Sequence, residues 1–239
     1  MKIFEFQLPV TFHNQLNPKL WKDEELLPEV RLKLLASARE FISFLKMENL
    51  PLRDIVITGS NTNLTYTDKS DLDLHIIVDM DKIYDGNDLV RQFFDSKRRL
   101  WNKTYDVTVR SIPVEVYVED NDETVQGNAF SLMSAQWLKR LPLDRVDINE
   151  RSVKAKYLQM VRDIKRALER ADSTDDFTRL MKKIKDYRQS GLDRYGEFST
   201  ENLVFKSLRN NGWLETIDQQ RTELVNKMLS LKEKQDIFV

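Results

Sequence analysis

Two aspartates, Asp71 and Asp73, alternate with leucines in an aliphatic segment that runs to Val78. If this segment is a strand, side chains two positions apart face the same side of the sheet, about 6.5 Å apart along the backbone. Mg²⁺ prefers hard oxygen ligands and is commonly held by one or two carboxylates together with substrate phosphates. Two such ions, about 3.5 to 4 Å apart, can bind the attacking and leaving oxygens of a phosphoryl transfer. The pair therefore predicts a magnesium site for phosphoryl chemistry, with Mn²⁺ as an alternative ion.

A third carboxylate, Glu115, is expected to complete this site. It alternates with Val114, Val116 and Val118, so it faces the polar side of a strand that we place in the same sheet. Asp106, in the preceding strand, is the alternative third ligand. An exposed charge paired across strands would explain Glu115 without any metal.

Gly59 and Ser60 end a short apolar run and precede the aspartates by a polar loop. Glycine has no side chain, so the backbone at Gly59 can approach a triphosphate closely. The Ser60 hydroxyl and neighbouring backbone N–H groups can hold the phosphate oxygens. In the alternative interpretation, Gly59 is a turn residue and Ser60 caps a helix. The functional interpretation makes this loop the phosphate-binding part of the site.

The elements that position these residues follow from the hydrophobic periodicity. Apolar residues at helical spacing predict a helix that begins near Pro28 and ends near Asn49, and a second helix is predicted at 88–101. Strands are predicted at 54–58, 71–78, 105–109 and 113–118, the last two as a hairpin because three residues separate them. After about residue 142 the strand pattern ends. The remainder predicts helices at 150–171, 174–189, 199–210 and 214–234.

The combination of Gly59-Ser60, Asp71-x-Asp73 and a later acidic residue resembles the nucleotidyltransferase superfamily typified by DNA polymerase β. The resemblance covers residues 52–118. Many members have Asp at the third acidic position, where this chain has Glu115. The resemblance implies an α+β fold with a mixed sheet flanked by helices, and transfer of a nucleoside monophosphate from an NTP with release of pyrophosphate. It assigns Asp71 and Asp73 to both of two Mg²⁺ ions and Glu115 to the ion that acts on the acceptor.

A second resemblance extends over most of the chain. It is to nucleotidyltransferase-like proteins of tailed phages and some bacteria, and it rests on the segments Leu16–Trp21, Val114–Asp120 and Gly196–Leu203 and on Leu208-Arg209. The helical part also resembles the layout of oligonucleotide synthases and of polyadenylating or tRNA-end enzymes, in which such a domain closes the nucleotide cleft. We therefore expect a catalytic domain at 1–142 and a helical domain at 143–239 that closes over the nucleotide.

Charge differs between the two parts. The first 150 residues carry six more acidic than basic residues, and the remainder carries five more basic than acidic ones. This balance favours an RNA 3′ end or a nucleotide as acceptor, although a protein hydroxyl and a small molecule stay open. Lys182 and Lys183 can bind the triphosphate, and Tyr187 can stack on the base. A solvated helix face explains the lysines equally, and core packing explains the tyrosine.

Composition excludes several other functions. The chain of 239 residues has no cysteine, so thiolate zinc sites, disulfides and cysteine nucleophiles are excluded. No apolar run approaches the roughly 18 residues of a membrane span, and the first ten residues lack the features of a secretory signal. We expect a soluble cytoplasmic protein. Two other functions compete with the enzyme: a catalytically inactive binding or antitoxin-like protein with the same fold, and a structural protein. The intact carboxylates favour the enzyme.

Overall fold

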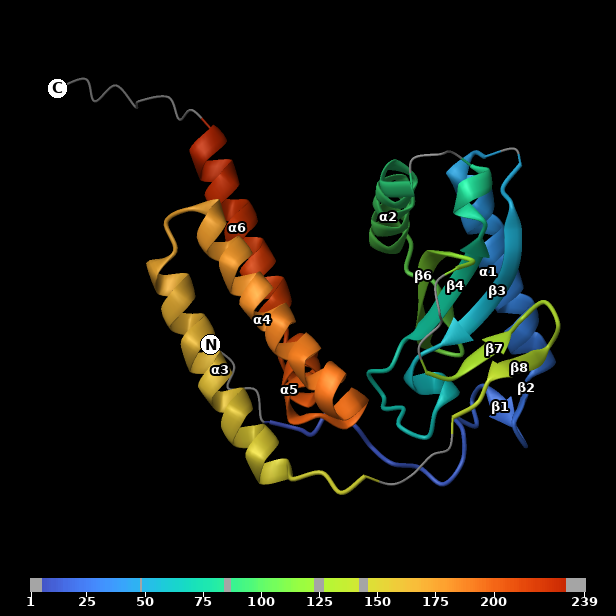
Figure 1. Cartoon of the computed structure of the whole chain (residues 1–239), viewed down its shortest axis with the longest axis horizontal. Coiled ribbons are helices and arrows are strands. Elements are labelled where there is room, and N and C mark those ends of the chain that lie inside the picture. The colour runs from blue at the N-terminus through green and yellow to red at the C-terminus, as the bar shows by residue number, and fades with distance from the viewer. Residues whose placement is uncertain (1–5, 48, 84–86, 123–126, 142–145, 231–239) are drawn as a thin grey trace. The chain divides into compact units, whose positions relative to one another are not determined.

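The computed structural model describes residues 6–47, 49–83, 87–122, 127–141 and 146–230 (Figure 1). The chain divides into two compact units. One unit spans Thr11–Arg145, and the helical unit combines Val146–Val239 with Met1–Val10. The first unit is of the α+β class, with a six-stranded mixed sheet and two long helices, and the second is helical. This agrees with the expected fold class at that level.

The helical unit includes a segment from the start of the chain, which the predicted division at residue 142 assigns to the catalytic domain. Phe6, Leu8 and Val10 pack with the core of the helical unit and not with the sheet. Their alternating apolar pattern has no feature that assigns it to either unit, because the contacts are made with helices far along the chain. The expected boundary between 142 and 143 itself lies outside the described residues.

The large sheet has the strand order β5-β6-β4-β3-β7-β8. The strands are β3 (Leu52–Thr58), β4 (Leu72–Val78), β5 (Thr108–Val109), β6 (Ile112–Asp120), β7 (Ala129–Ser131) and β8 (Gln136–Lys139). β4 and β6 are parallel, and every other neighbouring pair is antiparallel. The parallel pair requires a crossover, which helix α2 (Asn87–Thr104) supplies. A separate two-stranded sheet consists of β1 (Trp21–Lys22) and β2 (Glu25–Leu26).

The two faces of the large sheet differ in polarity. One face packs against α2 and against helix α1 (Pro28–Leu45). Its β4 side chains are all buried: Leu72, Leu74, Ile76 and Val78. Burial of each large apolar side chain contributes about 1.5 to 3 kcal/mol. The alternate residues of the same strand, including Asp73 and His75, lie on the opposite face, where the candidate site forms.

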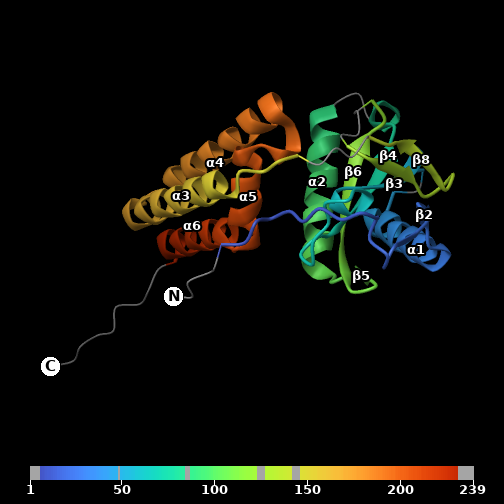
Figure 2. The same ribbon diagram turned by 90° about the horizontal axis from the view of Figure 1, so that it is seen from below.

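Helix α2 also runs along strand β6, as both ribbon views show (Figures 1 and 2). The short strand β5 pairs only with Ile112 and Pro113, so the rest of β6 has no described strand on its outer side. Asn102 of this helix pairs with the backbone of Val116: its Nδ2 donates to the Val116 carbonyl at 3.2 Å, and the Val116 N–H donates to its Oδ1 at 3.1 Å. The two bonds replace the ladder bonds that a further strand would make. The position of β6, and with it Glu115, is thereby tied to α2.

The predicted elements of the first unit are confirmed in type, with differences in extent. The expected hairpin is an antiparallel pair, but β5 has only two residues, with Thr108 opposite Pro113. The pattern did not predict β1, β2, β7 or β8, which have two to four residues each. Strands this short give too few alternating positions for periodicity to register.

The helical unit consists of α3 (Glu150–Arg170), α4 (Thr174–Tyr195), α5 (Thr200–Asn210) and α6 (Trp213–Leu229), with a 3₁₀ turn at Gly196–Phe198. The four predicted helices are therefore confirmed. Their core includes Tyr157, Ile164, Ile184, Leu203 and Ile217. Helix α4 continues past the predicted end at 189, and residues 231–234 of the last prediction lie outside the described part. None of the helices in the described ranges is both long and apolar enough to cross a membrane.

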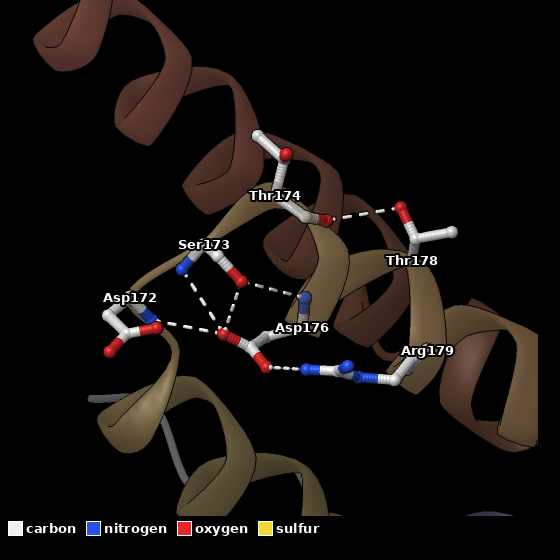
Figure 3. A network of polar contacts seen from close by, with 6 residues as sticks. All are labelled: Asp172, Ser173, Thr174, Asp176, Thr178 and Arg179. Carbon is white, nitrogen blue, oxygen red and sulfur yellow. Dashed lines mark hydrogen bonds and ion pairs between the residues drawn. The ribbon is translucent and has the colours of Figure 1, made fainter.

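A capping box fixes the turn between α3 and α4 (Figure 3). Ser173 donates its hydroxyl and its backbone N–H to Asp176 Oδ2, at 2.7 and 3.1 Å, and the Asp176 N–H donates back to the Ser173 hydroxyl at 3.4 Å. The Ser173 hydrogen bond, followed by that of Arg179, holds the pKa of Asp176 well below its usual range. Reciprocal bonds of this kind satisfy backbone donors that the first helical turn leaves open.

Candidate functional site

The register of the sheet places three polar residues in one row across neighbouring strands. Asp73 on β4 lies opposite Thr58 on β3 and opposite Glu115 on β6. Residues opposite each other in adjacent strands share a face, so all three lie on the face away from α1 and α2. Asp71, two positions before Asp73, ends the loop that leads into β4. Strand spacing and the parallel β4–β6 register together bring the acidic residues to one place.

Asp71, Asp73 and Glu115 form a carboxylate cluster. Each offers one oxygen, and the three oxygens lie within 4.8 Å of one another, with all three residues partly buried. A set made only of carboxylate oxygens has the chemistry that Mg²⁺ and Mn²⁺ prefer, and three like charges this close repel each other without a cation. The donor set therefore fits a divalent cation. Asp106, the alternative third ligand, is exposed between α2 and β5 and is not part of the cluster.

Gly59 connects β3 to the loop beside this cluster. Its φ of 84° lies in the left-handed region, which favours glycine, and its backbone lies directly against the carboxylate of Asp73. Gly59, and not Ser60, occupies the N-cap position of the 3₁₀ turn at Ser60–Thr62, and no side chain caps that turn. The Ser60 hydroxyl instead donates to Ser70 Oγ at 2.7 Å. The alternative interpretation of Ser60 as a helix cap is therefore wrong.

Asn61 holds the loop in place, a role that the sequence pattern does not indicate. It is fully buried. Its Nδ2 donates to the Asp71 carbonyl at 2.7 Å, and its Oδ1 accepts from Asn17 at 2.9 Å. The Trp21 indole N–H donates to the Asn61 carbonyl at 2.8 Å. An asparagine just after a Gly-Ser pair looks like an ordinary turn residue, because its partners lie in a distant part of the sequence.

A second row of side chains extends the site along the same face. The Tyr117 hydroxyl donates to Glu115 Oε2 at 2.6 Å, and the Tyr117 ring stacks on His75 with centroids 5.0 Å apart. His75 Nε2 is 2.9 Å from the Thr58 hydroxyl. Its Nδ1 approaches Glu119 Oε1 at 2.8 Å, without the alignment of a hydrogen bond.

Tyr117 is held in its protonated form by this environment. Burial, the hydrogen bond to Glu115 and the nearby negative charges, of which Asp73 is the strongest, raise its pKa far above the usual range. Tyr117 was not among the predicted site residues, although its position two residues after Glu115 puts both side chains on one face of a strand. That spacing was the available signal.

The three residues expected to contact the nucleotide from the helical part all lie on α4. Lys182 and Lys183 are exposed, and Lys182 Nζ donates to Asp186 Oδ2 at 2.6 Å, one turn along the helix. Tyr187 is partly buried against the helical core, and burial raises its pKa. These contacts match the solvated face and core packing that were the alternatives. A role for the three residues in nucleotide binding stays a prediction.

Comparison with models of known protein families gives no match for the chain, and neither does comparison with curated proteins. Among solved structures, a STING-associated CdnE c-di-GMP synthase from Capnocytophaga granulosa is similar at 13% sequence identity. The match covers 85% of this chain and 83% of that chain, with a TM-score of 0.22. At a TM-score this low, the likeness adds nothing to the fold and the site described above.

Proposed function

We propose that this protein is a nucleotidyltransferase that transfers a nucleoside monophosphate from an NTP to a hydroxyl acceptor. The observation that carries the proposal is the convergence of Asp71, Asp73 and Glu115, whose ligand oxygens lie within 4.8 Å of one another. The cluster lies on the polar face of the sheet, beside a loop in which Gly59 brings backbone close to Asp73. Carboxylates grouped next to such a loop suit a triphosphate with its divalent cations.

In the proposed reaction, the acceptor oxygen forms a bond to the α-phosphorus of the NTP. The bond from that phosphorus to the oxygen bridging to the β-phosphate breaks, and pyrophosphate leaves. The proton of the acceptor hydroxyl passes to the carboxylate of Asp73 or Glu115. Bound divalent ions supply charge neutralisation at the phosphates and lower the pKa of the acceptor hydroxyl. Asp71 and Asp73 would hold both ions, and Glu115 would hold the ion nearer the acceptor.

Backbone N–H groups near Gly59 and Ser60 are the donors that we assign to the triphosphate. The Ser60 hydroxyl already donates to Ser70, so it must turn away from Ser70 to reach a phosphate oxygen. The loop itself is fixed by the buried bonds of Asn61. A loop fixed before substrate binds does not have to be ordered at the expense of binding free energy.

For the acceptor we propose an RNA 3′ end or a second nucleotide. The excess of basic residues after residue 150 supports a partner that carries phosphates. Lys182, Lys183 and Tyr187 of α4 are the residues that we expect to contact it or the NTP. The prediction that the helical domain closes over the nucleotide stays a prediction.

The test is incubation of the protein with each α-labelled NTP, Mg²⁺ or Mn²⁺, and either RNA or an unlabelled nucleotide. We expect label in the acceptor and one pyrophosphate released for each transfer. D73N, which keeps the side-chain volume and removes the charge, should lose both signals. NTP binding without transfer by the wild type would instead identify an inactive binding protein. The absence of Mg²⁺-dependent NTP binding would contradict the enzyme and the binding protein alike.

A further inference from the structure

We propose that Tyr117 is a positioning residue that fixes Glu115 in the orientation in which it binds a divalent cation. The inference rests on the proposed function, because it assumes that the carboxylate cluster binds metal. Tyr117 itself is assigned no contact with substrate or ion. It acts through its hydrogen bond to Glu115.

The geometry of the bond defines what Tyr117 can do. Its hydroxyl donates to Glu115 Oε2 at 2.6 Å, a short distance typical of a hydroxyl bonded to a charged oxygen. The bond fixes Oε2 and with it the plane of the carboxylate, and an ionised carboxylate keeps further lone pairs for a cation. Glutamate has three side-chain rotatable bonds and loses much conformational freedom when it is fixed. A partner that fixes the carboxylate in the metal-free protein reduces the freedom left to lose on binding.

Side chains of two other elements contact the Tyr117 ring. Its ring stacks on His75 of β4, with centroids 5.0 Å apart, and the guanidinium carbon of Arg98 on α2 lies 4.9 Å from the ring centroid. His75 in turn bonds the Thr58 hydroxyl on β3 at 2.9 Å. The phenol therefore has a fixed ring plane, and its hydroxyl is directed at Glu115 by contacts that do not involve the carboxylates.

Loss of the Tyr117 hydroxyl is expected to weaken metal binding strongly. Removal of a hydrogen bond that orients a metal ligand typically costs about 10- to 100-fold in metal affinity or activity. Y117F removes only the hydroxyl and keeps the ring that stacks on His75. We expect it to raise the Mn²⁺ dissociation constant about 10- to 100-fold. Transfer activity should recover as Mn²⁺ approaches saturation, because no group that contacts substrate has been lost.

The decisive measurement is Mn²⁺ titration of the whole protein, without NTP, followed by the electron paramagnetic resonance signal of the free ion. Y117F is compared with the wild type in this titration. Y105F is the matched control, since Tyr105 is an exposed tyrosine of the same unit. Thermal unfolding in metal-free buffer is recorded for each variant. Y117L, which also removes the ring, should weaken Mn²⁺ binding as much as Y117F does. It should in addition lower the melting temperature.

A double-mutant cycle tests whether Tyr117 acts through Glu115. The shorter side chain of E115D keeps the carboxylate but draws it back from the Tyr117 hydroxyl. In the E115D background, Y117F should change Mn²⁺ affinity by less than about twofold, because coupled residues do not contribute additively. Equal losses in both backgrounds would overturn the inference, as would unchanged Mn²⁺ affinity with a lowered melting temperature in Y117F. A wild type that binds no Mn²⁺ would overturn the proposed metal site itself, a result distinct from either of these.

Discussion

Gly59 lies so close to Asp73 that a side chain at position 59 has no room. A Cβ atom built at Gly59 would lie 2.1 Å from Asp73 Oδ2 and 3.1 Å from its Cγ. Gly59 also has a positive φ of 84°. A side chain at position 59 would therefore have to displace the Asp73 carboxylate that we assign to metal binding.

G59A should therefore displace the Asp73 carboxylate. We expect loss of Mn²⁺ binding and about a 100-fold loss of transfer activity, the cost of misplacing a reacting group by about 1 Å. G127A is the matched control, because Gly127 has a φ of 83° and nothing within 4 Å of a built Cβ. Both variants incur strain of about 1 to 3 kcal/mol from the positive φ, measurable by urea unfolding. Only G59A should lose metal binding and activity, so equal behaviour of the two would contradict the prediction.

D71N should be inactive yet folded, and Mn²⁺ should stabilise it much less than the wild type. In metal-free buffer it should melt at or above the wild-type temperature, because one of three repelling carboxylates is removed. Mn²⁺ at 100 times its dissociation constant should stabilise the wild type by about 2.7 kcal/mol and D71N by far less. Thermal unfolding with and without Mn²⁺ measures both effects. An equal shift in the two proteins would exclude Asp71 as a ligand.

E115Q should lose transfer activity but keep Mg²⁺-dependent NTP binding. The triphosphate itself supplies oxygens to one ion, whereas the ion near the acceptor depends on the third carboxylate. D106N is the matched control because Asp106 is exposed and not part of the cluster. Calorimetric NTP titration and the labelled-NTP assay separate binding from transfer. An inactive D106N together with an active E115Q would reverse the assignment of the third ligand.

The double charge reversal K182E/K183E should weaken NTP or acceptor binding, and the loss should shrink as salt increases. Lys182 pairs with Asp186 on an exposed helix face, so the double variant should change the free energy of unfolding by less than about 1 kcal/mol. K227E, on the exposed surface of α6, controls for a change in charge of the helical unit. Binding is measured by fluorescence anisotropy at several salt concentrations. Unchanged binding would make these lysines a solvated face, and Lys206 and Arg209 would be tested next.

The capping box predicts a pH dependence in the helical unit. Because the pKa of Asp176 is lowered in the folded protein, its stabilising effect is complete above the unfolded pKa of about 3.9 and is lost as pH falls towards the folded pKa. D176N should therefore melt below the wild type at pH 7, and the difference should shrink below about pH 4. S173A, which removes the serine hydroxyl of the capping box, should lower the free energy of unfolding by about 0.5 to 2 kcal/mol at pH 7. A difference in melting temperature that does not change with pH would show that the charge of Asp176 does not contribute to stability.

The sequence predicted the parts of the site that depend on local spacing. Alternation within the predicted strands 71–78 and 113–118 identified Asp71, Asp73 and Glu115 as residues on the polar face. The structure brings their carboxylates together, although β4 itself begins one residue after Asp71. It did not predict the parts that depend on contacts between distant segments. Asn61 in the polar loop bonds Asn17 and Trp21, which lie some 40 residues earlier in the chain, and Phe6 packs with helices that come much later. Periodicity describes which way a side chain faces but not which distant element it will meet.

The pairing of Asn102 with Val116 has a consequence for how the protein behaves at high concentration. Beyond its short pairing with β5, β6 has no described strand on its outer side. Open N–H and C=O groups at such a place can recruit a strand from another molecule, which is a route to aggregation. Asn102 occupies both groups of Val116, in the middle of β6. These two bonds oppose strand addition at Val116, next to Glu115, and they also oppose a one-residue slip that would turn Glu115 to the opposite face.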